Sequence, residues 1–163
     1  MPDDQDADAY AVVCSRLDGQ WELHLLPTAS ALDLRAMTEA VSRQPGERGA
    51  FALANVADEF FVVVRVQEGR ARVLLSDVTA AVEWDLARQA LDHLGLEVPG
   101  DDDRAEVWPA GDLGVFDDLG LEAMAMGAIL ADVDAYADEM LSAVARRLGF
   151  ADRFERVVAT LLG

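Results

Sequence analysis

The stretch that decides the fold is Phe60-Phe61-Val62-Val63-Val64-Arg65-Val66, an almost uninterrupted apolar run of strand length. A strand with one face in water alternates apolar and polar residues, whereas a strand buried on both faces reads as a continuous apolar run. The sequence therefore predicts that residues 60–66 form a central strand of a sheet.

Further strands are predicted on either side of this run. Residues 51–56 precede it, and residues 72–75 return after the turn signal Glu68-Gly69. Because strands joined by short turns pair in antiparallel fashion, residues 51–75 are expected to form a three-stranded meander.

A hairpin is predicted at the start of the chain. Residues 10–17 and 20–25 are strand-like and flank Asp18-Gly19, a strong signal for a two-residue turn. Residues 20–25 alternate strictly between polar and apolar side chains, so one face of this strand is expected to pack on the core.

Helical segments follow each group of strands. Ser30 and Asp33 have the spacing of a capping box and predict a helix start, and that helix is expected to end before Pro45-Gly46. A second helix is predicted over residues 79–95, and residues 112–163 have helical periodicity to the end.

The predicted fold is therefore α+β, with a mostly antiparallel sheet of about five strands and a helical C-terminal third. The order is hairpin, helix, three-strand meander, helix, and the helices are expected to cover one face of the sheet. Residues 1–8 are expected to be a disordered acidic tail. Residues 9–163 are expected to be one domain, with the sheet and two helices in 9–95 and the C-terminal helices in 112–163.

Composition excludes several classes of function. The chain carries 31 Asp and Glu against 13 cations, a formal net charge of -18, which disfavours direct nucleic-acid binding. All 13 cations are arginine, so lysine chemistry is excluded. No apolar run reaches the length of a membrane helix, and residues 1–8 do not resemble a signal peptide. With one cysteine, Cys14, the expected location is the cytoplasm and no membrane association is expected.

Neither an active site nor a cofactor or metal site is predicted. Only Cys14, His24 and His93 could supply nitrogen or sulfur ligands, which is too few for a zinc centre. The H-x-E and P-C-x-x-C signature of zinc deaminases is absent, as is the G-x-S-x-G of serine hydrolases. Cys14 lies in an apolar strand, where a buried and inert thiol is the usual case. The sequence thus predicts a protein that is not an enzyme.

The carboxylates near residue 134 fit a helix terminus better than a cation site. Asp134 is expected to cap a helix, with Asp138 and Glu139 in its first turn and Arg146 and Arg147 in its last. That arrangement complements the helix dipole at both ends.

An interaction surface is predicted around a Trp in an acidic loop. Trp108 is either a core plug, the commoner role for an aromatic, or an interface anchor. The methionines at 124, 126 and 140 are expected to fill the core before they serve a partner. The predicted surface consists of Trp108, Asp101, Asp102, Asp103, Asp117 and Asp118.

Several motifs together resemble a known family. They are residues 58–65, residues 73–81, Pro109-Ala110-Gly111-Asp112-Leu113, Asp138-Glu139-Met140-Leu141 and Arg147-Leu148-Gly149-Phe150. These stretches resemble the bacterial tRNA adenosine deaminase-associated proteins, and the likeness runs from about residue 10 to residue 158. The family often has proline at the position of Ala137, a minor departure because proline at the first helical position is replaceable.

The resemblance implies an accessory or regulatory protein associated with tRNA adenosine deaminase, acting by protein–protein interaction without catalytic residues of its own. An acidic, homodimeric binding or chaperone-like module for another protein is the alternative. A third possibility is a carboxylate-dependent enzyme using Asp112, Asp117 and Asp118, or Asp132 and Asp134. Clustering of those carboxylates around a pocket with raised pKa values would favour the enzyme.

Overall fold

The computed structural model describes residues 9–46, 48–99, 108–132 and 134–161. The predicted acidic tail and the predicted surface residues Asp101, Asp102 and Asp103 lie outside the described residues.

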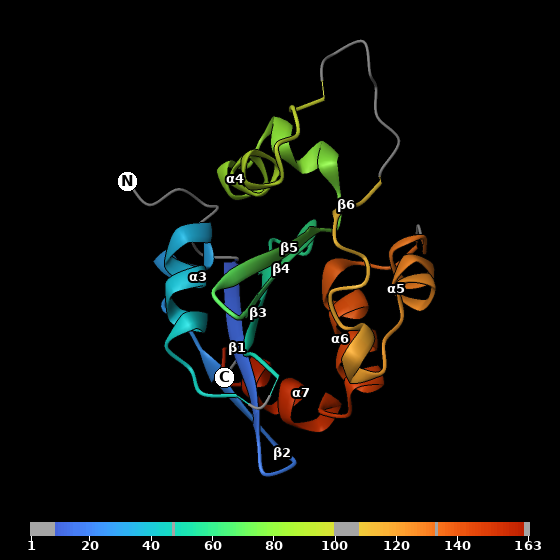
Figure 1. The fold of residues 1–163 in the computed structure, drawn as a ribbon. Helices are drawn as coiled ribbons and strands as arrows, with labels where there is room; N and C mark the ends of the chain where they lie inside the picture. The colour runs from blue at the N-terminus through green and yellow to red at the C-terminus, as the bar shows by residue number, and fades with distance from the viewer. Residues whose placement is uncertain (1–8, 47, 100–107, 133, 162–163) are drawn as a thin grey trace.

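A six-stranded sheet forms the middle of the molecule (Figure 1). Its order is β2-β1-β3-β4-β5-β6, and every neighbouring pair is antiparallel. The strands are β1 (Ala9–Leu17), β2 (Gln20–Leu25), β3 (Phe51–Val56), β4 (Phe60–Gln67), β5 (Arg70–Leu75) and β6 (Ala110–Gly111). The predicted hairpin and meander are both confirmed.

The apolar run occupies the position predicted for it. β4 lies between β3 and β5, and its residues from Phe60 to Arg65 are buried. The sixth strand, β6, comes from the stretch between residues 96 and 111 and pairs with the end of β5. Gly111 has φ 105°, and a Cβ at this position would collide with the carbonyl oxygen of Val73. Only glycine permits this close approach of the two backbones.

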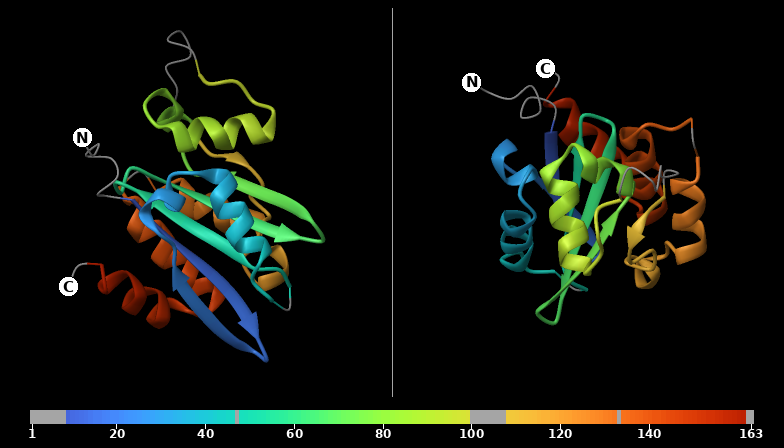
Figure 2. Two further views of the ribbon diagram at one scale, coloured as in Figure 1. Left: turned by 90° about the vertical axis from the view of Figure 1, so that its left-hand side faces the viewer. Right: turned by 90° about the horizontal axis from the view of Figure 1, so that it is seen from above.

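Helices cover both faces of the sheet, so the expectation that they cover one face is wrong (Figure 2). One face carries α2 (Thr28–Ala31), α3 (Leu34–Ser42), the 3-10 helix η1 (Val78–Val82) and α4 (Asp85–Leu94). The other carries the 3-10 helix η2 (Asp117–Leu119), α5 (Ala123–Leu130), α6 (Ala137–Leu148) and α7 (Ala151–Ala159). β4 requires this arrangement, because Val62 and Val64 belong to one hydrophobic core while Phe61 and Val63 belong to the other.

Two predicted helix starts are shifted. Asp33 is itself the cap of α3, where its Oδ1 accepts from the amides of Arg35 (3.0 Å) and Ala36 (3.4 Å), so the capping box beginning at Ser30 is wrong. Asp134 does not cap α6, because that helix begins after Tyr136, whose amide donates to Glu139 Oε1 at 3.2 Å.

The charges predicted for the ends of α6 are confirmed. Asp138 and Glu139 lie in its first turn and Arg146 and Arg147 in its last, where they complement the helix dipole. Among the described helices, none combines the length and the apolar composition needed to cross a lipid bilayer.

Candidate protein-binding surface

The structure separates the predicted surface residues that it describes. Trp108 is 50% exposed, so it does not plug the core, and its carbonyl oxygen accepts from the amide of Val78 at the start of η1. Asp117 and Asp118 lie in η2. Asp118 is bound to Arg65 near the end of β4, whereas Trp108 lies near the start of that strand, beyond the end of β5. Trp108 and these two aspartates therefore do not form one site.

Asp118 has a structural role, because it binds a buried arginine. The guanidinium of Arg65 is fully buried and binds Asp118 through two hydrogen bonds, Nη1 to Oδ1 at 2.6 Å and Nη2 to Oδ2 at 2.9 Å. The same group donates to the carbonyl oxygens of Val115 (2.6 Å) and Arg48 (2.7 Å). These bonds from Arg65 hold the pKa of Asp118 below its ordinary value. A carboxylate held ionised in this way is unsuited to act as a general acid.

A second arginine, Arg72, binds the same segment of the chain, residues 112–118. Arg72 Nε donates to Asp112 Oδ2 at 2.6 Å, and its Nη2 donates to the carbonyl oxygen of Gly114 at 2.9 Å. Asp117 Oδ1 accepts from the amide of Ala123 at the start of α5 (2.9 Å). We name residues 112–118 the arginine-bound loop, because Arg65 and Arg72 tie its carboxylates to the sheet. Sequence reasoning missed this role, although an arginine inside an apolar strand requires a carboxylate or carbonyl partner.

A different set of carboxylates surrounds an open cleft of about 730 Å³. It forms where the β3–β4 turn, the start of η1 and the segment before α6 meet, and the amide of Ala137 donates to the carbonyl oxygen of Asp58 across this junction (3.2 Å). We name it the acidic cleft. Five carboxylates and two aromatic rings line it, from Asp58, Glu59, Asp77, Glu83, Asp134, Trp84 and Tyr136.

Among the residues that the structure describes, no cation neutralises the charges of the acidic cleft. Neutral groups donate to three of the carboxylates: Trp84 Nε1 to Glu59 (2.7 Å), Asn55 Nδ2 to Asp58 (2.8 Å), and the Thr79 amide and hydroxyl to Asp77. In the described part of the chain, no arginine forms a salt bridge with any of the five. The described residues also contain no group of three His, Cys, Asp or Glu arranged to hold a metal ion. Carboxylates beside aromatic faces suit the cationic side chains of a protein partner.

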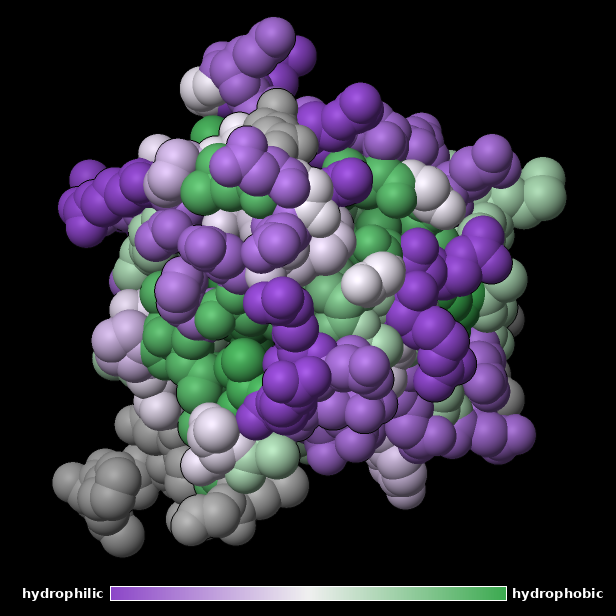
Figure 3. All heavy atoms as spheres, turned by 90° about the horizontal axis from the view of Figure 1, so that it is seen from below, coloured by the Kyte–Doolittle hydropathy of each residue, from purple (hydrophilic) through white to green (hydrophobic). Residues whose placement is uncertain are grey.

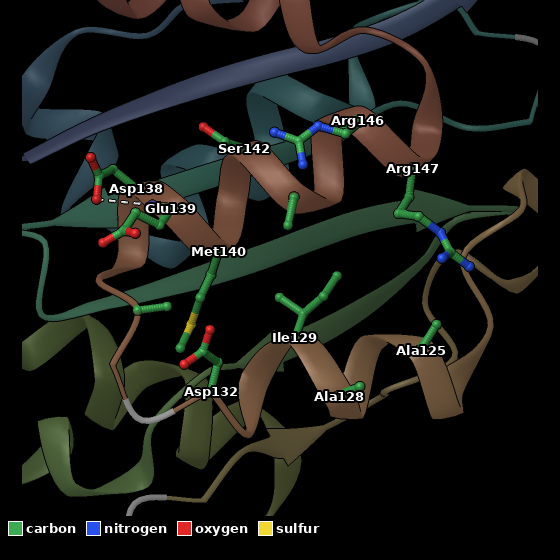
Figure 4. A pocket seen from close by; sticks show the side chains of 12 residues that line it. Ala125, Ala128, Ile129, Asp132, Asp138, Glu139, Met140, Ser142, Arg146 and Arg147 are labelled. Carbon is green, nitrogen blue, oxygen red and sulfur yellow. Dashed lines mark hydrogen bonds between the residues drawn. The ribbon is translucent and has the colours of Figure 1, made fainter.

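A second depression, of about 660 Å³, lies between α5 and α6, and we name it the α5–α6 groove (Figure 4). Every side chain of α5 is apolar, yet this helix lies at the surface and buries only Met126 and Leu130 fully. Met124 is 87% exposed, so the expectation that it fills the core is wrong, whereas that for Met126 is confirmed. Met140 is partly buried against the core and also lines the groove.

On the side seen in Figure 3, hydrophilic residues cover most of the molecule and hydrophobic residues show between them in separate areas. The acidic cleft, with its unpaired carboxylates, and the α5–α6 groove, with its largely apolar α5 wall, are the described features best suited to a protein partner.

Comparisons with known proteins identify the family. Residues 9–151 match the profile of the Rv3753c-like tRNA adenosine deaminase-associated proteins. The chain is 38% identical over 155 residues to Protein Rv3753c of Mycobacterium tuberculosis, covering 94% of this chain and 90% of that protein. No solved structure matches the chain. Because the profile spans most of the sequence, this chain belongs to the Rv3753c-like tRNA adenosine deaminase-associated protein family.

Proposed function

We propose that this protein is a non-catalytic accessory or regulatory protein that binds tRNA adenosine deaminase through its acidic cleft. The observation that carries the proposal is the association in the family's description, taken together with a cleft whose five carboxylates have no cationic partner in the described chain.

Electrostatics supports a direct contact. An enzyme that binds tRNA must present cationic side chains to the phosphate backbone, and a protein of net charge -18 is attracted to such a surface. In the proposed complex, arginine or lysine side chains of the deaminase enter the acidic cleft. The bound accessory protein then competes with tRNA for part of the same basic surface.

The roles of the remaining carboxylates support a function without catalysis. Asp112 and Asp118 are bound to arginines, and Asp117 accepts an amide at the start of α5. Asp132 Oδ1 accepts from the amide of Asp134 at 3.1 Å, a local turn contact. These groups therefore have structural partners, which favours a binding protein over a carboxylate-dependent enzyme.

The test is a reconstitution with the purified deaminase from the same organism. We expect binding in about 50 mM salt and a much weaker complex in about 500 mM salt, because added ions screen the attraction between exposed charges. Inosine formation in tRNA, measured with and without this protein, should change only at salt concentrations that permit the complex. Absence of binding at both salt concentrations would overturn the proposal.

A further inference from the structure

No described element covers the outer side of α5, on which Met124 is exposed. A surface helix of a soluble domain normally presents polar residues to water, but residues 123–130 read Ala-Met-Ala-Met-Gly-Ala-Ile-Leu. Met124 is 87% exposed, and Ala125, Ala128 and Ile129 line the α5–α6 groove. Such an apolar surface is typical of a helix that is covered by a partner.

The two ends of the groove have opposite charges (Figure 4). Asp132, Asp138 and Glu139 lie at the end formed by the last turn of α5 and the first turn of α6, and Arg146 and Arg147 lie toward the other. Within the described part of the chain, none of these five side chains forms a salt bridge. The groove thus carries an acidic end and a basic end, neither of which is matched inside one copy.

We propose that this groove binds a second copy of the chain in a two-fold symmetric homodimer, with α5 of each copy lying antiparallel to α5 of the other. A two-fold axis through the middle of the groove brings its acidic end against the basic end of the partner copy and repeats the contact at the other end. The apolar side chains between the charged ends are then covered by the same side chains of the partner copy. A groove that is complementary to itself is what an isologous interface requires.

The side chains of the groove permit close contact between the two α5 helices. Ala125, Ala128 and Ala143 line the groove and leave room for the backbone of a second helix. The flexible Met140 of the groove, and Met124, which is exposed on α5, can fill the remaining space. Packing of this kind, with an apolar centre and charges at the rim, is the usual anatomy of a protein interface. The dimer does not depend on the deaminase, so its test and the test of the proposed function are separate.

Paired charge reversals test the dimer. In sedimentation velocity over a range of protein concentrations, the native chain should dimerise. Arg146→Asp with Arg147→Asp should raise the dimer Kd by about tenfold or more, because two acidic ends then face each other. Asp132→Arg with Asp138→Arg should do the same with two basic ends. Combining all four substitutions restores the complementarity and the native net charge, so it should restore the dimer.

Two further variants test whether the expected effects are specific to α5 and the groove beside it. Arg35→Asp with Arg43→Asp changes the net charge as much as the Arg146 and Arg147 pair. These two residues lie in α3 and at its C-cap, on the other side of the sheet, so this variant should leave the dimer intact. Met124→Glu should dissociate the dimer without unfolding the monomer, because this side chain is mostly exposed in one copy.

Three results would overturn the proposal. One is a native chain that stays monomeric at all concentrations. Another is a four-fold variant that keeps its circular dichroism spectrum but does not dimerise. The third is a Met124→Glu chain that dimerises as tightly as the native one.

Discussion

The arginine-bound loop and the acidic cleft contain the same type of side chain in opposite circumstances. In the loop, Asp112 and Asp118 each accept hydrogen bonds from an arginine, and Arg65 is completely buried. In the cleft, carboxylates face an open space and receive hydrogen bonds from neutral donors alone among the described residues. A carboxylate that is bound to an arginine of the sheet therefore stabilises the fold, whereas a carboxylate cluster without cations among the described residues is available to another molecule.

Removing the buried guanidinium of Arg65 should have the largest effect on stability. Arg65→Ala removes a fully buried group that makes four hydrogen bonds, and it leaves the carbonyl oxygen of Val115 without its donor. We therefore expect a loss of about 3–5 kcal/mol in the free energy of unfolding. Urea denaturation measures it. Replacing both partners with apolar residues, Arg65→Met with Asp118→Leu, should destabilise the protein less than Arg65→Ala, because methionine fills much of the vacated space and no carboxylate is left unpaired. A loss as large in the double variant would contradict the interpretation of this pair as an ion pair.

Breaking the second arginine contact should have a smaller effect. The side chains of Arg72 and Asp112 are 30% and 36% exposed, so water screens the pair. We expect Arg72→Ala to lower the free energy of unfolding by about 1–2 kcal/mol, the value of a partly exposed ion pair and two further hydrogen bonds, to Gln67 Oε1 and the carbonyl oxygen of Gly114. A loss equal to that of Arg65→Ala in the same denaturation experiment would show that burial does not set the difference.

The pH dependence of the free energy of unfolding tests the role of Asp118. The folded-state pKa of Asp118 lies below its unfolded value, chiefly because of the hydrogen bonds from Arg65. Its contribution is therefore fully present above about pH 4, the ordinary Asp pKa, and is lost as the pH falls through the folded-state pKa. Unfolding free energies measured between neutral pH and the acid transition should decline less for Asp118→Asn than for the native chain. An identical decline would contradict this role of Asp118.

Neutralising the cleft should have the smallest effect on stability. The side chains of Glu83 and Asp134 accept no hydrogen bond from the described residues, and both are exposed. Glu83→Gln with Asp134→Asn should change the free energy of unfolding by no more than about 0.5 kcal/mol in urea denaturation. A loss comparable to that of Arg72→Ala would mean that the cleft carboxylates, like those of the arginine-bound loop, stabilise the fold.

Much of the sheet could be predicted from the sequence because its signals are local. The apolar run of β4 and the turn at Asp18-Gly19 are each contained in a few residues, and the structure confirms both elements. The same run also implied cover on both faces, so the expectation of helices on one face conflicted with information already in the sequence. The short β6 carries no signal of its own, since its two residues acquire strand geometry by pairing with β5.

The contacts that distinguish the carboxylates could not be predicted, because they join distant segments. Arg65 and Asp118 are 53 positions apart, and the acidic cleft unites residues 57–59, 77–84 and 134–136. Asp118 and Asp134 look alike in the sequence, and only the fold places one against a buried guanidinium and the other beside open space. For the same reason the exposure of Met124 and Trp108 could not be derived from spacing.

The most direct test of the account is the affinity for tRNA adenosine deaminase of two variants with equal net charge. Glu83→Arg with Asp134→Arg alters the acidic cleft, whereas Glu22→Arg with Glu155→Arg alters exposed positions on β2 and α7. In isothermal titration calorimetry we expect the cleft variant to bind the deaminase about tenfold more weakly than the native chain, with a much smaller loss for the other variant. Equal losses would show that bulk charge rather than the cleft drives binding, and unchanged affinity in the cleft variant would contradict the account.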